Sequence, residues 1–200
     1  MPHYSGDTIT VDAEDLVADL RAEQQRIEAE ADRIGSDGFD ITNSEFLTLA
    51  DDETADGVTD EQFRDALREE YVERKHQIDE LETRFHEWGG SKFTLRHLTA
   101  GDIARRGDWV NAKALSENAK DIRSQSHATR IITVAIGVTK MPGEAGPEKE
   151  DGIKYVRERL PTVLVRWLYD KIENLTNYGE ADLDDFSDLP PSLAPNSGSN

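Results

Sequence analysis

The sequence feature that most constrains the fold is a run of apolar residues at helical spacing between two recognisable helix boundaries. Its members recur three, four or seven positions apart: Phe63, Leu67, Tyr71, Ile78, Leu81, Phe85 and Trp88. Thr59 and Gln62 match a capping box, and Gly89-Gly90 ends the segment. The pattern predicts one long helix over about residues 60–88, with Arg74 at the one seam position that is not apolar.

A second amphipathic helix is predicted over residues 12–34, with Asp12 as its cap and Gly35 as its stop. Its apolar stripe comprises Leu16, Leu20, Ile27, Ala31 and Ile34. Glu23 stands where an apolar residue would complete the heptad. Because the stripe is narrow and needs a partner, the two helices predict either a hairpin or a coiled-coil-like arm. Residues 35–58 between them predict a loop around a short helical turn.

From Lys92 onward the elements become shorter. Residues 92–98 alternate like a short strand, and Thr99 with Asp102 fits a cap that opens a helix directly after it. Asp108 is a further possible cap, for a helix that continues at helical spacing into the β-branched stretch 131–138. This order predicts a compact module that begins with a strand followed at once by a helix.

The stretch 131–138 suits a strand by its β-branched residues, but no turn signal separates it from the preceding helix, which favours a buried helix end. A Pro- and Gly-containing loop over 140–152 follows. We then expect a short helix over 153–160 and a longer one that opens at Pro161 and ends at Gly179.

Charge is distributed unevenly along the chain, which has 42 Asp+Glu, 23 Lys+Arg and a net charge of −19. Residues 1–91 hold 26 acids and 8 bases, residues 92–179 hold 11 acids and 15 bases, and residues 180–200 hold 5 acids and no base. We therefore expect an acidic helical region, a mildly basic helical module and a disordered acidic tail, in that order. The predicted fold class is mainly α, with at most one short strand.

The acidic surface also bears on partners and on the host. It would repel nucleic acid at low salt, so binding of nucleic acid by the whole chain is not expected. Abundant Asp, with 8 Lys beside 15 Arg, is a composition associated with proteins of salt-loving archaea and their viruses.

No catalytic, metal or cofactor motif is recognisable in the sequence. The chain has no cysteine, its five histidines lack ligand spacing, and Gly-rich phosphate loops are absent, so we expect a non-enzymatic protein without cofactor. Its longest mostly apolar run is too short to cross a bilayer, and no membrane partner is expected. Residues 52–57 resemble the start of a calcium loop, but Phe63 or Gln62 falls where a bidentate Glu is needed. A calcium-binding regulatory protein is one alternative function.

Two groups of basic residues in the module could receive an acidic or aromatic partner segment. One group combines Arg105 and Arg106 with Trp109, and the other comprises Arg157, Arg159 and Arg166. Salt bridges within the chain explain the same residues equally well.

The module resembles the tail assembly chaperones of long-tailed, siphovirus-like viruses. The resemblance rests on KFTLRHLTAGD at residues 92–102, and on ERLPTVLVRWLYDKIENLTNYG at residues 158–179 with its Leu-Pro step and closing amphipathic helix. With the acidic composition, it points to a virus of a haloarchaeal host. Residues 1–91 have no counterpart in that family.

The resemblance implies a small helical protein that self-associates and coats the tape measure protein while tail tube subunits polymerise around it, in the host cytoplasm during assembly. A structural component of the virion neck or tail is the alternative. Under either reading the candidate partner-binding residues are Arg105, Arg106, Trp109, Leu115, Ile122, Leu164, Trp167, Leu168 and Ile172.

Overall fold

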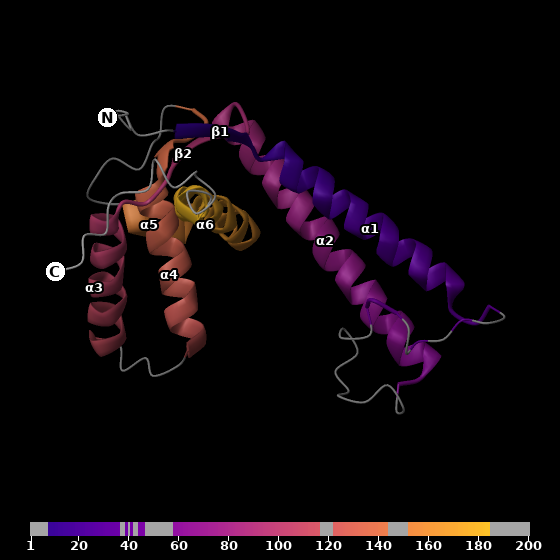
Figure 1. The fold of residues 1–200 in the computed structure, drawn as a ribbon. Helices are drawn as coiled ribbons and strands as arrows, with labels where there is room; N and C mark the ends of the chain where they lie inside the picture. Colours follow the sequence, from indigo (N-terminus) through magenta and orange to yellow (C-terminus); the bar gives the residue numbers. More distant parts are fainter. Residues whose placement is uncertain are drawn as a thin grey trace, which may run out of the picture. The chain divides into compact units, whose positions relative to one another are not determined.

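The computed structural model describes residues 8–36, 39, 41, 44–46, 58–116, 122–143 and 152–184, and for 112–116, 122–124 and 178–184 it describes the backbone alone. The described chain divides into two compact units (Figure 1). The hairpin unit contains residues 12–92 together with 142–143, and the sheet unit contains the other described residues. The division lies beside residue 92, where the charge changes sign, but residues 8–11 join the sheet unit.

The hairpin unit is an antiparallel pair of helices, α1 (Glu14–Arg33) and α2 (Asp60–Trp88), which pack along their lengths (Figure 1). The bounds of α2 coincide with the predicted ones, and both bonds of its capping box form. The Gln62 N–H donates to Thr59 Oγ1 over 3.2 Å, and the Thr59 N–H donates to Gln62 Oε1 over 2.9 Å. Gly89 ends the helix in the left-handed conformation at φ 69°, which glycine adopts without strain. Of the two predicted arrangements, the structure has the hairpin.

Helix α1 begins two residues later than predicted, because Asp12 ends a strand instead of opening the helix. The Asp12 carboxylate still accepts a hydrogen bond from the Glu14 N–H over 3.2 Å, and a second one from the Ser91 hydroxyl over 2.6 Å. These bonds favour the ionised carboxylate and lower the pKa of Asp12. Asp12 thus joins the start of α1 to the segment that follows α2.

The core of the hairpin unit lies between the two helices. Its buried apolar residues are Ala13, Leu16, Val17, Leu20, Ile27, Ile34, Phe46, Phe63, Leu67, Ile78 and Leu81. Phe46 comes from the connection between the helices, where it packs on a cluster with Ile27, Ile34 and Phe63. Residues 37–38, 40, 42–43 and 47–57 of the predicted loop lie outside the described part of the chain.

The sheet unit contains a sheet of three short strands in the order β1 (Thr8–Asp12), β2 (Lys92–Arg96) and β3 (Val138–Lys140). Strand β2 pairs antiparallel with β3, with Leu95 opposite Val138 and an irregularity between Thr94 and Leu95. The predicted strand after Lys92 is confirmed, as is the mainly helical fold class. The expected maximum of one strand is wrong, because β1 and β3 also join the sheet. Strand β1 has β-branched residues from Thr8 to Val11, whereas β3 is only three residues long.

Four helices complete the sheet unit: α3 (Ala100–Ser116), α4 (Ile122–Gly137), α5 (Gly152–Arg159) and α6 (Thr162–Asp184). Helix α4 packs against α3, α5 and α6 (Figure 1). The buried apolar residues of this unit are Phe93, Leu95, Leu98, Ala128, Ile131, Ile132, Val134, Val138, Met141, Val156, Leu160, Leu164, Val165, Leu168 and Ile172. The β-branched stretch is helical as far as Gly137, as predicted, and only its last residue enters a strand.

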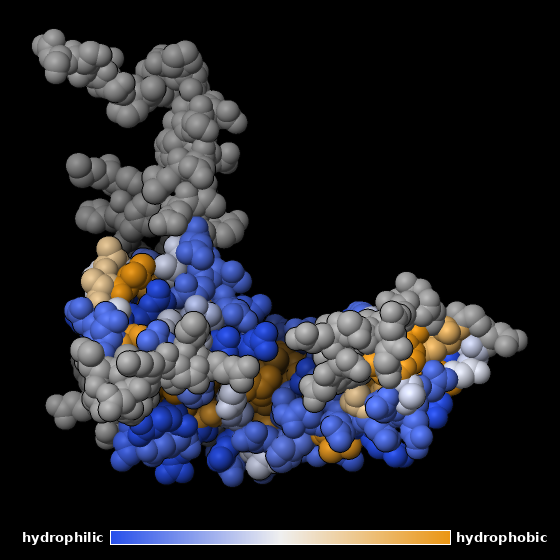
Figure 2. Space-filling view, turned by 90° about the horizontal axis from the view of Figure 1, so that it is seen from below, coloured by the Kyte–Doolittle hydropathy of each residue, from blue (hydrophilic) through white to orange (hydrophobic). Residues whose placement is uncertain are grey.

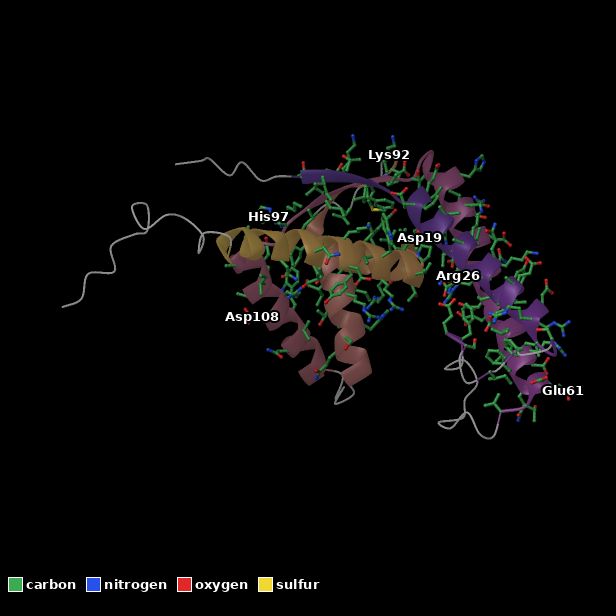
Figure 3. The ribbon with its side chains drawn as sticks, turned by 45° about the vertical axis from the view of Figure 1, so that its right-hand side comes forward. Asp19, Arg26, Glu61, Lys92, His97 and Asp108 are labelled. Atoms are coloured by element: carbon green, nitrogen blue, oxygen red, sulfur yellow. The ribbon has the colours of Figure 1, made fainter. Side chains whose placement is uncertain are left out.

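Two helix boundaries differ from the prediction. Asp108 caps no helix, because it lies inside α3, which the box of Thr99 and Asp102 has already opened (Figure 3). Helix α6 begins one residue after Pro161 and continues through Gly179 to Asp184. The predicted disordered tail therefore begins with helical residues, and its remainder from 185 lies outside the described chain.

Candidate partner-binding surfaces

The outer surface of α3 carries two large apolar side chains in contact with solvent. Ile103 and Trp109 are each 41% exposed, and Arg105 between them is also exposed. Exposed Trp and Arg side chains are the types that most often dominate protein–protein binding energy. Arg105 and Trp109 lie four positions apart on the same side of α3, and we call them the α3 patch, whereas Ile103 is exposed on a different side of the helix. The sequence singled out Arg105 and Trp109, and it missed the exposed Ile103.

Arg106 does not belong to this patch, although it neighbours Arg105 in sequence. Its guanidinium pairs with Glu173 of α6 and donates to the Thr133 hydroxyl of α4 over 3.0 Å. Thr133 is fully buried, and this bond satisfies its hydroxyl. Arg106 therefore ties α3 to α4 and α6. Burial, with the nearby Glu173 carboxylate, raises the pKa of Tyr169 beside this group.

The predicted contact residues of α6 are mostly core residues. Leu164, Leu168 and Ile172 are completely buried. Trp167 is half-buried, and the Lys171 ammonium lies 5.2 Å from its ring centroid, within the range of a cation–π interaction. These four residues hold the sheet unit together, so Trp167 alone among them retains surface for a partner.

Two further predicted contact residues, Leu115 and Ile122, lie on helix backbone whose side chains are outside the described part of the structure. The second basic group is exposed on α5 and α6: Arg157, Arg159 and Arg166. Its one ion pair among described residues joins Arg157 to the adjacent Glu158 over 3.3 Å, and an exposed pair of this kind contributes little to stability. Among the described residues, this group therefore has no internal salt bridge of consequence.

The start of α3 is fixed by a buried carboxylate. Asp102 Oδ2 accepts from Arg96 Nη1 over 2.7 Å and from the Thr99 N–H over 3.1 Å, and the Asp102 residue is only 8% exposed. The Arg96 guanidinium, with the bonds from Thr99, holds the pKa of Asp102 well below its usual range. Strand β2 and helix α3 are therefore held in one orientation, which determines how the α3 patch is presented.

The hairpin unit has two hollows. The first, of about 610 Å³, lies beside the start of α1 and is crossed by the ion pair between Arg21 and Glu82. The second, of about 410 Å³, has Ile27 and Leu67 in its floor. Its other lining residues are Glu28, Ala31, Asp32, Arg64, Arg68 and Tyr71. On each helix, every residue that lines a hollow has another lining residue three or four positions away, which is the spacing of residues on one side of a helix. Both hollows therefore lie along one face of the hairpin.

A cluster of charged side chains lies in the seam between α1 and α2. Arg74 Nε lies 2.9 Å from Glu23 Oε2 and Arg74 Nη2 lies 3.2 Å from Glu23 Oε1, so the pair is bidentate. Arg74 also pairs with Glu70 one turn earlier on α2. The two polar residues that interrupted the apolar stripes in the sequence therefore pair with each other.

Metal-ion clusters and membrane-spanning helices are both absent from the described residues. Within those ranges, no group of three or more His, Asp or Glu side chains is arranged to hold a metal ion. The candidate calcium segment at 52–57 lies outside them. Among the helices that the structure describes, none is both long and apolar enough to cross a membrane. On the face that Figure 2 shows, the described surface is predominantly hydrophilic and carries several apolar patches.

Comparisons of the chain with protein-family models, with curated proteins and with solved structures found no match. The fold and its surfaces define the class of protein instead. It is a mainly helical protein with an acidic helical hairpin and a small sheet unit that presents an aromatic and basic patch.

Proposed function

We propose that the chain is a non-enzymatic tail morphogenesis protein of a virus with a salt-loving host, which self-associates and binds the tape measure protein as a tail assembly chaperone. The resemblance of residues 92–179 to that family supports the viral role. The observation that carries the binding role is the α3 patch, where Trp109 is 41% exposed one helical turn from exposed Arg105.

The patch suits a helical, partly acidic partner. Trp109 would supply apolar area, and Arg105 would pair with a carboxylate at the margin of the contact. Truncation of a central Trp in an interface commonly costs about 2 kcal/mol or more, which is about 30-fold in affinity. Because Arg96 and Arg106 fix α3 through Asp102, Glu173 and Thr133, the patch needs little ordering on binding.

Co-expression of the full chain with the tape measure protein and the tail tube subunit of the same virus tests this proposal. We expect capture of the tape measure protein, and a loss of about 30-fold in affinity for Trp109→Ala with unchanged circular dichroism. Val72→Ala is the matched control, because Val72 is an apolar side chain of the hairpin unit that is 57% exposed. Equal binding by Trp109→Ala and the wild type would contradict the assignment of the patch.

The alternative role as a neck or tail component of the virion makes a different prediction. A chaperone should be absent from purified particles, whereas a structural component should be present there in fixed stoichiometry. Quantitative mass spectrometry of particles separates the two. The calcium-binding alternative is tested by calorimetric titration at high salt, where the absence of calcium heat and unchanged helicity on chelation would remove it.

A further inference from the structure

The second hollow of the hairpin unit separates opposite charges across an apolar floor. Buried Ile27 and Leu67 form the floor, with half-buried Ala31 and Tyr71 beside them. On one rim α1 presents Glu28 and Asp32, one helical turn apart. On the other rim α2 presents Arg64 and Arg68, also one turn apart. We call these the acidic rim and the basic rim.

The two arginines of the basic rim differ from the other arginines of the hairpin helices, each of which pairs with a carboxylate. Arg21 pairs with Glu82, Arg26 with Glu45, and Glu23 with Arg74. Among the described residues, by contrast, the two acids of the acidic rim and Arg68 have no ion pair, and Arg64 donates to the Ile34 carbonyl over 3.3 Å. Four charged groups therefore surround an apolar floor without satisfying one another.

We propose that a second copy of this chain docks on this face of the hairpin, related by a twofold axis parallel to α1 and α2. That axis places α1 of each copy against α2 of the other. Since both rims lie at the same height along the hairpin, each acidic rim then faces the basic rim of the partner copy. At the other end, Arg21 of each copy faces Glu82 of the other in the same way. The two apolar floors close into the core of a four-helix bundle.

The charge pattern selects this axis over the other twofold arrangement. An axis across the helices would stack α1 on α1 of the second copy and place acids opposite acids, which is unfavourable. A peptide of one charge sign would satisfy one rim and leave the other unpaired. A second copy satisfies both rims at once, which is why it is the occupant that fits.

This inference deepens the self-association included in the proposed function, and it rests on the hairpin alone. The α3 patch belongs to the other unit, so loss of tape measure binding and loss of the dimer are separate observations. A dimer that forms while Trp109→Ala leaves tape measure binding intact would count against the proposed function and for the docking inference.

Sedimentation equilibrium of the full chain tests the dimer, at about 0.15 M salt, where charges farther apart than about 8 Å are largely screened. We expect a dimer for the wild type. Glu28→Lys/Asp32→Lys should make both rims basic, and Arg64→Glu/Arg68→Glu should make both acidic. Each variant should weaken the dimer by at least about 10-fold. Asp65→Lys/Glu69→Lys is the matched control, because it makes the same charge change at exposed positions on the outward side of α2 and should stay dimeric.

Mixing the two rim variants supplies a test that a folding defect cannot imitate. Each acidic rim then meets a basic rim on the other chain, and the heterodimer should form with near wild-type affinity. The chain with all four substitutions should also dimerise with itself, which an axis across the helices would not allow. A monomeric wild type, rim variants that remain dimeric, or a mixture that remains monomeric would each overturn the proposal.

Discussion

Replacing Arg74 with leucine should destabilise the hairpin unit, although it makes the apolar seam more complete. The Arg74 side chain is 21% exposed, and its partners Glu23 and Glu70 are 30% and 21% exposed. Without Arg74 these two carboxylates lose their shared cation in a partly dry seam. Breaking a buried pair costs about 3–5 kcal/mol and an exposed pair about 0–1 kcal/mol, so we expect about 2 kcal/mol here.

The double variant Glu23→Leu/Arg74→Leu should recover the part of that stability that is lost at Glu23, while Glu70 stays without Arg74. It replaces the cross-helix pair with apolar contact, which is commonly neutral or stabilising where the volumes fit. Glu23→Leu alone should cost less than Arg74→Leu, because Arg74 keeps its pair with Glu70. A double-mutant cycle should then give a coupling energy of about 2 kcal/mol between the two positions.

Urea unfolding followed by Trp88 fluorescence measures these differences in the hairpin unit. A background of Trp109→Phe/Trp167→Phe leaves Trp88 as the single tryptophan of the chain. With a slope of about 1–2 kcal/mol per M, the midpoint of Arg74→Leu should fall by about 1–2 M. All variants should be compared at one protein concentration, because self-association adds stability. Equal midpoints for Arg74→Leu and wild type, or a double variant as unstable as Arg74→Leu, would refute the reasoning.

Three further predictions concern individual contacts. Arg96 lowers the pKa of Asp102 in the folded state, so the unfolded state binds a proton at this carboxylate more readily. The stability of the sheet unit should therefore fall as the pH drops below about 5. In acid titrations followed by circular dichroism, Asp102→Asn should show a weaker dependence of stability on pH. Gly137→Ala would place a Cβ 2.6 Å from Ile172 Cδ1 and should lower the free energy of unfolding by about 1–3 kcal/mol in thermal unfolding. Gly107→Ala is the control, because no described atom lies within 4 Å of its Cβ, and it should be neutral or stabilising. Equal effects of the two variants would contradict the close approach at Gly137. Thr59→Ala removes a cap of α2 and should cost about 1 kcal/mol, with Thr59→Ser as the variant that retains it.

Local signals in the sequence predicted the elements well where the deciding atoms are close in the chain. The box of Thr59 and Gln62, the apolar spacing and Gly89 determine α2 because each acts within a few residues. Strands β1 and β3 escaped prediction because their pairing with β2 connects segments far apart in sequence. Asp108 does not cap a helix, because helix α3 has already begun at Ala100. The sequence offers two candidate caps for this region, and it does not show by itself which one opens the helix.

The candidate surfaces show the same limit. Arg105 and Arg106 are adjacent, and residues one apart on a helix point about 100° apart, so only packing shows which faces solvent and which faces Glu173. Leu164, Leu168 and Ile172 have the periodicity of a buried face and of a docking face alike. Their complete burial assigns them to the core. The rim charges of the hairpin flank its apolar stripe, but only the pairing of α1 with α2 brings them around one hollow.

By itself, the sequence determined that this chain is mainly helical, acidic at its start, and built around a long capped helix over 60–88, because propensity, capping and charge are local or additive properties. The tertiary structure decided that Glu23 and Arg74, 51 residues apart, neutralise each other, and that three separate short segments form one sheet. It also decided that Trp109 stays in solvent while its predicted companions on α6 are mostly buried. These outcomes depend on which surfaces meet, and periodicity identifies an apolar face without naming the face that it packs against.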